Sequence, residues 1–181
     1  TNCIAHHLQA LGVNKGDRVS LLLRNPLISS LMMFGIWKLG AIYSPINFNY
    51  TGRLLAYQIN DTDPVLLITE RQYISIINEI THEIQRDTLP IVIHNPKKED
   101  HDYHPEHAQV TLNKFVELSL EPLLEGDSTN LDVTLNYWDT ANIIYTSGTT
   151  GSAKGVLQSH RWNFACTYYM SNTLNHDDVI Y

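Results

Sequence analysis

Four short apolar runs alternate with segments of helical periodicity, and this alternation constrains the fold more than any other feature. The apolar runs are Arg18–Leu23, Ile42–Ile46, Val65–Thr69 and Leu89–His94. The segments with apolar residues at helical spacing are Cys3–Leu11, Pro26–Leu39, Thr51–Asn60 and Tyr73–Ile84. Strands that alternate with helices form parallel sheets, because each helix carries the chain back to the edge where it started. The sequence therefore predicts an α/β fold with an open, mostly parallel sheet flanked by helices.

A glycine-rich segment, residues 146–155, lies between the apolar pairs Ile143-Ile144 and Val156-Leu157. It holds three of the nine glycines of the chain, several hydroxyl side chains and Lys154. Glycines let the backbone approach an anion closely. Free N–H groups and hydroxyls donate hydrogen bonds to phosphate oxygens, and a lysine adds positive charge. We expect a phosphate-binding loop here, and a plain polar hairpin is the alternative.

The order of residues in this segment differs from the P-loop of classical nucleotide triphosphatases. In that motif, Gly-x-x-x-x-Gly-Lys-Ser/Thr opens a helix. Here Gly155 follows Lys154, and the next residues, Val156-Leu157-Gln158, have the character of a strand. We therefore expect a loop between two later strands, not a helix N-terminus, to hold the phosphates.

The string Tyr-Thr-Ser-Gly-Thr-Thr-Gly-Ser-Ala-Lys-Gly-Val at residues 145–156 resembles the phosphate-loop signature of the adenylate-forming superfamily. Acyl-CoA synthetases, peptide-synthetase adenylation domains and firefly luciferase belong to this superfamily. The segments Leu11–Val19, Lys38–Asn47 and Ser159–Asn163 are similar to further motifs of its large N-terminal domain. The chain departs from the signature at Ala153, where the family usually has proline. The resemblance extends over the whole chain.

This resemblance implies ATP-dependent activation of a carboxylic acid to an acyl-adenylate, followed by thioester formation with CoA. Mg²⁺ would neutralise part of the phosphate charge. Lys154 is the catalytic candidate, in contact with the β- and γ-phosphates and the leaving pyrophosphate, and an exposed loop lysine is the alternative. The candidate cofactor-binding residues are Thr146, Ser147, Gly148, Thr149, Thr150, Gly151, Lys154 and Gly155.

Two segments favour one branch of the family. Ser44–Asn47 and Tyr57–Pro64 are more similar to acyl-CoA synthetases, including carnitine/crotonobetaine-CoA ligases, than to peptide synthetases. A peptide-synthetase adenylation domain and a non-catalytic nucleotide-binding module remain the alternatives. The identity of the acid cannot be read from these residues, because the acyl pocket of the family lies largely after the matched region.

The resemblance also predicts the domain organisation. Residues 1–181 correspond to a single fragment of the N-terminal AMP-binding domain. The adenine-binding segments, the magnesium-binding acidic residue and the C-terminal catalytic lysine of the family all lie after the matched region. We therefore expect no metal ligands in this chain, and we expect the fragment alone to be inactive.

Composition excludes several other classes of partner. The net charge of −7 argues against binding to nucleic acid or to anionic membranes. The longest apolar run, Leu31–Trp37, is far shorter than the about 20 residues of a membrane span. Cys3 and Cys166 have no metal-binding or redox spacing, which suggests a reducing compartment. We expect a cytoplasmic protein that takes a carboxylic acid, ATP and CoA and that can form a homodimer.

Three further segments carry weaker expectations. His101, His104 and His107 have a spacing that suits a metal, but Pro105 would break a helix there, so we favour a solvated loop. Residues Asn113–Leu120 read as a short helix. Four aromatic side chains at near-helical spacing, for which we favour core packing over the wall of an acyl pocket, are Trp162, Phe164, Tyr168 and Tyr169.

Overall fold

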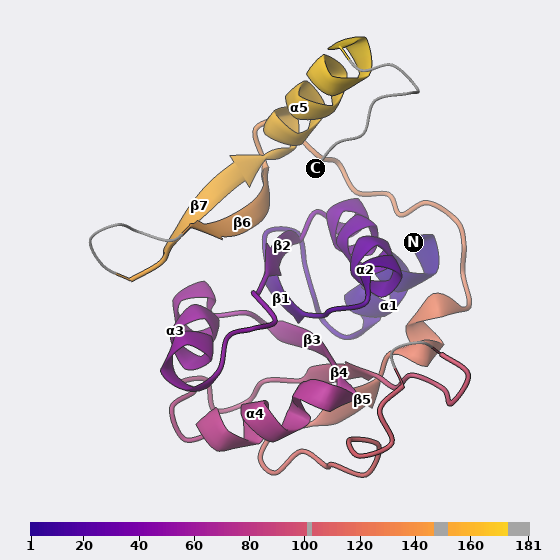
Figure 1. Ribbon diagram of the computed structural model, residues 1–181. Helices are drawn as coiled ribbons and strands as arrows, with labels where there is room; N and C mark the ends of the chain where they lie inside the picture. The colour runs from indigo at the N-terminus through magenta and orange to yellow at the C-terminus, as the bar shows by residue number, and fades with distance from the viewer. Residues whose placement is uncertain (101–102, 147–151, 174–181) are drawn as a thin grey trace.

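The computed structural model describes residues 1–100, 103–146 and 152–173. Across these residues, seven strands form one sheet in the order β5-β4-β3-β1-β2-β6-β7 (Figure 1). In chain order the strands are β1 (Arg18–Leu22), β2 (Ile42–Pro45), β3 (Leu66–Glu70), β4 (Ile91–His94), β5 (Glu117–Ser119), β6 (Thr140–Thr146) and β7 (Lys154–Ser159). Strands β1 to β6 pair in parallel, and β7 runs antiparallel to β6. The predicted α/β fold with a mostly parallel sheet is confirmed.

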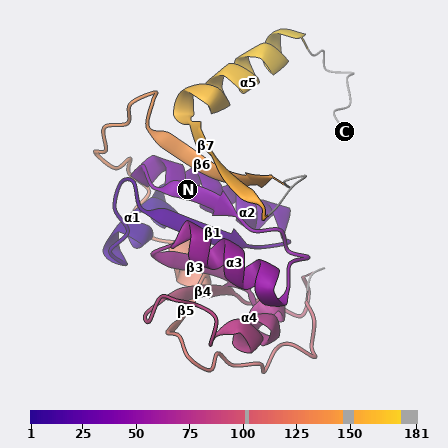
Figure 2. The same ribbon diagram turned by 90° about the vertical axis from the view of Figure 1, so that its left-hand side faces the viewer.

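Helices cover both faces of this sheet (Figure 2). The covering helices are α1 (Asn2–Ala10) and α2 (Pro26–Leu39) on one face, and α3 (Gly52–Thr62) and α4 (Ile74–Ile80) on the other. Successive residues of a strand point to opposite faces. Val19 and Leu21 of β1 thus pack with α1 and α2, whereas Leu22 packs with α3 and α4. Burial on both faces explains why the strands read as unbroken apolar runs.

Helix α2 shows how local sequence sets the bounds of an element. Its first residue is Pro26, and the side chain of Asn25 accepts hydrogen bonds from the N–H groups of Leu27 and Ile28 at 3.1 and 3.2 Å. The helix ends at Gly40, whose φ of 74° lies in the left-handed region that glycine adopts without strain. In the described part of the chain, no helix combines the length and the apolar character needed to cross a bilayer.

The helix expected at Asn113–Leu120 is wrong. Residues Glu117–Ser119 form β5, which pairs in parallel with β4 at the edge of the sheet. Leu118 and Leu120 are two residues apart and both pack into the core under α1 and α2. This two-residue alternation is a strand signal, and it is too short to outweigh the helical spacing of the surrounding apolar residues.

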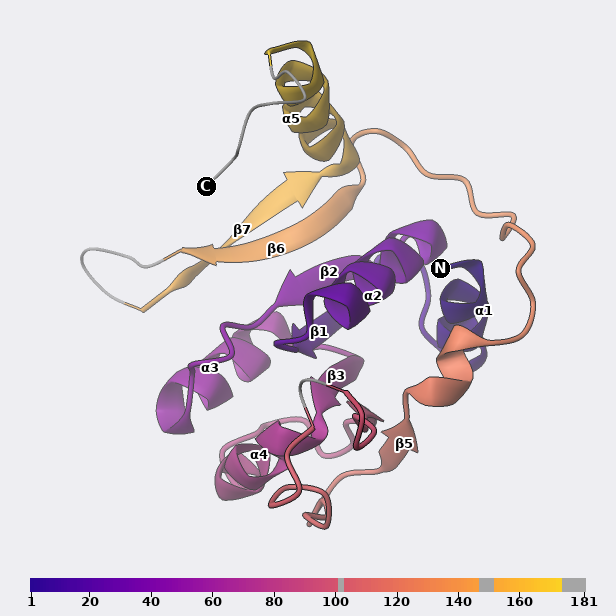
Figure 3. The ribbon, with the colours of Figure 1, turned by 45° about the vertical axis from the view of Figure 1, so that its right-hand side comes forward.

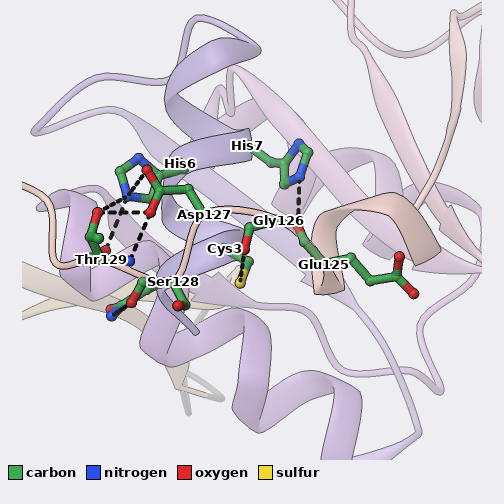
Figure 4. Close-up of polar contacts among 9 residues, drawn as sticks. Cys3, His6, His7, Glu125, Gly126, Asp127, Ser128 and Thr129 are labelled. Atoms are coloured by element: carbon green, nitrogen blue, oxygen red, sulfur yellow. Dashed lines mark hydrogen bonds and ion pairs between the residues drawn. The ribbon is translucent and has the colours of Figure 1, made fainter.

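A connector, residues 125–139, runs from the short helix η2 (Glu121–Leu124) to β6 and is held by polar side chains of α1 (Figure 4). The amide of Asn2 donates to the carbonyl of Ser128 at 2.6 Å. The Nε2 atoms of His6 and His7 lie 3.0 Å from the carbonyl oxygens of Thr129 and Glu125. These bonds satisfy backbone groups of a segment that lacks secondary structure of its own.

Farther along the connector, Lys15 and Gly40 fix its approach to β6. The ammonium group of Lys15 donates to the carbonyl of Thr134 at 2.8 Å and pairs with the Asp139 carboxylate at 2.7 Å. A Cβ atom at Gly40 would lie 2.7 Å from the Leu135 side chain, so the glycine also makes room for the connector. The connector therefore places the start of β6 against the end of α2.

Helix α5 (His160–Thr173) follows β7 and projects away from the rest of the fold (Figure 1). Core packing of its aromatic residues was expected and is wrong for the described chain, because Trp162, Phe164, Tyr168 and Tyr169 are all more than half exposed. Cys166 is exposed as well. A helix that leaves the sheet at its first turn has no second layer to bury its apolar side chains.

Glu121 provides a test of this fold through pH. Burial raises the pKa of its carboxyl, but hydrogen bonds from His94, Ser119 and the backbone N–H of Asn95 outweigh burial and lower the pKa to about 2. A carboxyl with a depressed pKa stabilises the fold above its unfolded pKa of about 4.5, and the contribution is lost as the pH falls toward 2. Because the side chain is 40% exposed, we expect a small contribution, about 1 kcal/mol at pH 7.

We therefore predict that Glu121→Gln lowers the free energy of unfolding at pH 7 and that the difference from wild type shrinks between pH 5 and pH 3. Urea unfolding at each pH measures it. Glu125→Gln, at an exposed neighbouring carboxylate, is the control. A difference between Glu121→Gln and wild type that does not change with pH would contradict the prediction.

Candidate functional site

The glycine-rich segment lies at the far end of the hairpin formed by β6 and β7. The last register pairs of the hairpin are Tyr145 with Gly155 and Thr146 with Lys154. Thr146, Lys154 and Gly155 are exposed. The expected position between two strands is confirmed. Five of the predicted cofactor-binding residues lie outside the described residues: Ser147, Gly148, Thr149, Thr150 and Gly151.

Gly155 has a packing reason to be glycine. A Cβ atom at this position would lie 2.8 Å from the Cγ2 atom of Ile143 and 3.3 Å from the ring of Tyr145. The missing side chain thus lets the Tyr145 ring lie beside the backbone of β7. A larger residue would have to displace Tyr145 or open the hairpin.

Helix α3 contacts Tyr145 of β6 and Ala153, the residue before β7. The Tyr145 hydroxyl donates to the Asp61 carboxylate at 2.6 Å and lies 3.0 Å from the Thr62 hydroxyl. The Tyr57 hydroxyl donates to the backbone carbonyl of Ala153 at 2.9 Å. Burial and the Asp61 carboxylate raise the pKa of Tyr145 to about 12, so its hydroxyl stays protonated at neutral pH. Sequence reasoning missed these contacts, because the partners are 83 to 96 residues apart.

A groove of about 380 Å³ lies beside the hairpin, at the carboxyl ends of β2 and β6. Its walls combine aromatic rings and side-chain amides, including those of Tyr43, Tyr50, Tyr145, Asn47 and Gln58. Burial raises the pKa of Tyr43. Tyr145 belongs both to this groove and to the contacts with α3, so the groove and the glycine-rich segment are adjacent.

The crevice between β1 and β3 is filled by the protein itself. The connection that leaves β1 leads to β2 on one side of this pair of strands, and the connection that leaves β3 leads to β4 on the other side, so the winding reverses between β1 and β3. Glu70 is fully buried at this point, and one of its carboxylate oxygens accepts the backbone N–H groups of Arg24 and Asn25, both at 2.6 Å. The Gln72 amide donates to the other oxygen. The usual ligand position of such sheets is thus occupied by a carboxylate.

A buried polar junction ties the base of the hairpin to its neighbours. The Asn142 side chain is 95% buried, and its carbonyl oxygen accepts from the indole N–H of Trp37 at 3.0 Å. Its amide donates to Gln158 of β7 at 3.2 Å and to Asn163 of α5 at 2.9 Å. One side chain therefore links α2, β6, β7 and α5.

His160 is the first residue of α5. Burial lowers the pKa of its imidazole, the Asp139 carboxylate partly opposing this. Its ring lies edge-on to the Trp37 ring, with the centroids 6.4 Å apart. His160 thus belongs to the base of the hairpin, at the opposite end from Lys154.

The loop after β4 that carries His104 and His107 lies away from this site, at the ends of β3 and β4. His104 and His107 lie in a small pocket with Arg71 and Asn95, and their ring centroids are 5.9 Å apart. His101 lies outside the described residues. Among the residues that the structure describes, no group of three or more His, Cys, Asp and Glu side chains is placed to hold a metal ion.

Comparison with known proteins identifies the class. Residues 1–181 match the AMP-binding enzyme family over the whole chain, and the chain belongs to this family. A medium/long-chain-fatty-acid–CoA/3-oxocholest-4-en-26-oate–CoA ligase of Mycobacterium marinum is 34% identical over 159 residues, which are 88% of this chain and 28% of that protein. A crotonobetaine/carnitine–CoA ligase of Salmonella heidelberg is 30% identical over 181 residues, 99% of this chain and 33% of that protein.

A solved structure agrees with these relatives. The fatty acyl CoA synthetase of Mycobacterium tuberculosis superposes with a TM-score of 0.72 and 26% identity, over 99% of this chain and 31% of that one. The resemblance to acyl-CoA synthetases that the motifs indicated is confirmed. The chain spans about a quarter to a third of the length of the relatives it matches.

The Asn142 junction gives a prediction for the stability of the hairpin. Asn142→Ala removes the donor to Gln158 and Asn163 and leaves their partly buried oxygens without it. We expect the free energy of unfolding to fall by about 1–3 kcal/mol, the cost of unsatisfied buried polar groups. Thermal and urea unfolding measure it, with Asn49→Ala at an exposed loop as the matched control. A loss no larger than that of the control would show that the junction does not stabilise the hairpin.

Proposed function

We propose that the full-length protein is an acid–CoA ligase that forms an acyl-adenylate from ATP and a carboxylic acid and then transfers the acyl group to CoA. One observation carries the proposal: an exposed lysine, Lys154, closes a glycine- and hydroxyl-rich segment at the end of a two-stranded hairpin, in a chain of the AMP-binding enzyme family. The CoA acceptor is proposed because the relatives described above are CoA ligases.

In this proposal the residues of the segment act on the phosphates of ATP. Lys154 contacts the β- and γ-phosphates and stabilises the charge that develops on the leaving pyrophosphate. Thr146, Ser147, Thr149 and Thr150 donate hydroxyl hydrogen bonds to the phosphate oxygens. The glycines Gly148, Gly151 and Gly155 let the backbone approach them. These donors lower the barrier to attack by the acid on the α-phosphorus because the charge grows during the reaction.

Mg²⁺ would bind with ATP and neutralise phosphate charge. From the family resemblance we propose that its protein ligand lies after the region matched here. We further propose that the chain is the first part of a larger AMP-binding domain. The part that follows would cover the aromatic face of α5, and the chain alone would not form acyl-adenylate.

The two cysteines, both free, suit the cytoplasm as the proposed location. Sedimentation of the full-length protein would test a homodimer.

The test is acid-dependent exchange of labelled pyrophosphate into ATP, followed by thioester formation with CoA across a panel of acids that includes fatty acids and carnitine-like betaines. We expect exchange with at least one acid. Lys154→Ala should slow it by about 10–100-fold, because one charge-assisted contact is worth about 1.5–3 kcal/mol.

Lys98→Ala, at an exposed lysine of the loop after β4, is the matched control and should leave the rate unchanged. An unchanged rate in Lys154→Ala would remove this residue from the mechanism. Exchange with a thioester forming only on a carrier protein would favour a peptide-synthetase adenylation domain. The absence of exchange with every acid would favour a non-catalytic nucleotide-binding module.

A further inference from the structure

Helix α3 holds the hairpin at two points, Tyr145 of β6 and Ala153, the residue before β7. Tyr145 comes just before the segment and is bonded to Asp61, at 2.6 Å, and to Thr62, at 3.0 Å. Ala153 comes just before Lys154, and its carbonyl accepts the Tyr57 hydroxyl at 2.9 Å. Tyr57 and Asp61 are four residues apart on α3, so they share one face of the helix. One helix face thus fixes the end of β6 and the residue that comes before β7.

The hairpin needs such support because its attachment to the sheet is narrow. Strand β6 has a single register pair with β2, Tyr43 with Asn142, whereas β1 and β2 share four. Beyond that pair the hairpin extends past the end of β2 toward the side where α3 lies (Figure 3). A two-stranded ribbon without further contacts is only marginally stable and twists strongly. The contacts with α3 are therefore placed where the hairpin is otherwise free to move.

The anchoring groups suit this task because most of them carry no charge. Thr62 is 98% buried, and the Tyr145 ring lies against Gly155 without a Cβ between them. The Tyr145 hydroxyl is a permanent donor at neutral pH, because its pKa lies near 12. The bond from Tyr57 goes to a backbone carbonyl, so it fixes the main chain directly beside Lys154 whatever side chain occupies position 153.

We propose that Tyr57, Asp61 and Tyr145 are positioning residues, which set the place of Lys154 relative to the phosphates of ATP by clamping the two ends of the glycine-rich segment to α3. The proposal rests on the proposed function. It assigns to α3 a share in phosphate recognition, although none of these three side chains touches ATP in the mechanism above. Asp61 acts as a hydrogen-bond acceptor for Tyr145 and not as a ligand of the substrate.

The kinetic test uses the full-length protein with the variants Tyr57→Phe and Tyr145→Phe, which each remove one hydroxyl and keep the ring. We expect kcat/KM for ATP in pyrophosphate exchange to fall by about 3–10-fold in Tyr57→Phe, the effect of one neutral hydrogen bond, and by at least as much in Tyr145→Phe, which loses a bond to a carboxylate. The KM for the acid should not change. Tyr73→Phe, at a half-buried tyrosine of η1 (Arg71–Tyr73), is the matched control and should not change it.

A double-mutant cycle separates positioning from a general loss of structure. In a Lys154→Ala background the same tyrosine variants should cost less than twofold, because the group that they position is absent. Full additivity of the effects would overturn the proposal. Asp61→Asn keeps an acceptor for Tyr145 and should retain most of the activity, whereas Asp61→Ala should behave like Tyr145→Phe. Equal loss in the two Asp61 variants would also contradict it.

Amide hydrogen exchange gives a readout that does not need activity. Tyr57→Phe and Tyr145→Phe should speed exchange at the end of the hairpin, at Gly155 and Val156, with the midpoint of unfolding close to that of Tyr73→Phe. Unchanged exchange at these amides would overturn the clamp. If the wild-type protein shows no pyrophosphate exchange with any acid, the proposed function fails, and with it the link to ATP, while the hydrogen-exchange arm still decides whether α3 holds the hairpin.

Discussion

The buried carboxylate of Glu70 occupies the crevice that the winding of the sheet creates, and the candidate site lies elsewhere. A doubly wound sheet offers a ligand site where its connections diverge, here between β1 and β3. In this chain Glu70 accepts hydrogen bonds from the N–H groups of Arg24 and Asn25, just before α2. A phosphate placed here would lie beside this carboxylate, and the two backbone N–H groups that could bind it already donate to Glu70. The candidate phosphate site lies instead at the edge of the sheet, on an added antiparallel hairpin.

A site on a hairpin at the edge of the sheet has to be held in place by elements outside the central strands. The β6–β7 hairpin is held at its base by Asn142 and by the connector, which Lys15 and the side chains of α1 hold in place. Its far end is held by α3. These supports come from elements far apart in the chain and meet only because the parallel sheet brings α1 and α2 to one face and α3 to the other. The parallel sheet and its helices thus support a hairpin that lies at the edge of the sheet.

The contrast between the central sheet and the hairpin at its edge explains which features the sequence could predict. The strands β1 to β4 and the helices α1 to α3 follow from periodicity, because both faces of the central sheet are buried and each local pattern agrees with the global one. The position of residues 146–155 between two strands follows from Val156 and Leu157. The sequence misled where burial depends on distant partners. Leu118 lies in an edge strand of three residues, and Leu120 directly follows that strand. The aromatic face of α5 lies beyond the described layers. The contacts of Tyr57 and Asp61 with the hairpin have no local signal at all.

The choice of tyrosine at both anchor points has a physical basis in the charge of the proposed ligand. An arginine or lysine at either position would compete with Lys154 for the phosphates, and a carboxylate on the strand itself would repel them. A phenol donates one directed hydrogen bond and remains neutral, and burial keeps the pKa of Tyr145 near 12. The one charged partner, Asp61, lies on α3 and directs an oxygen to the Tyr145 hydroxyl. The hairpin is therefore anchored without a cation among its anchoring side chains, so none of them would compete with Lys154 for the proposed triphosphate.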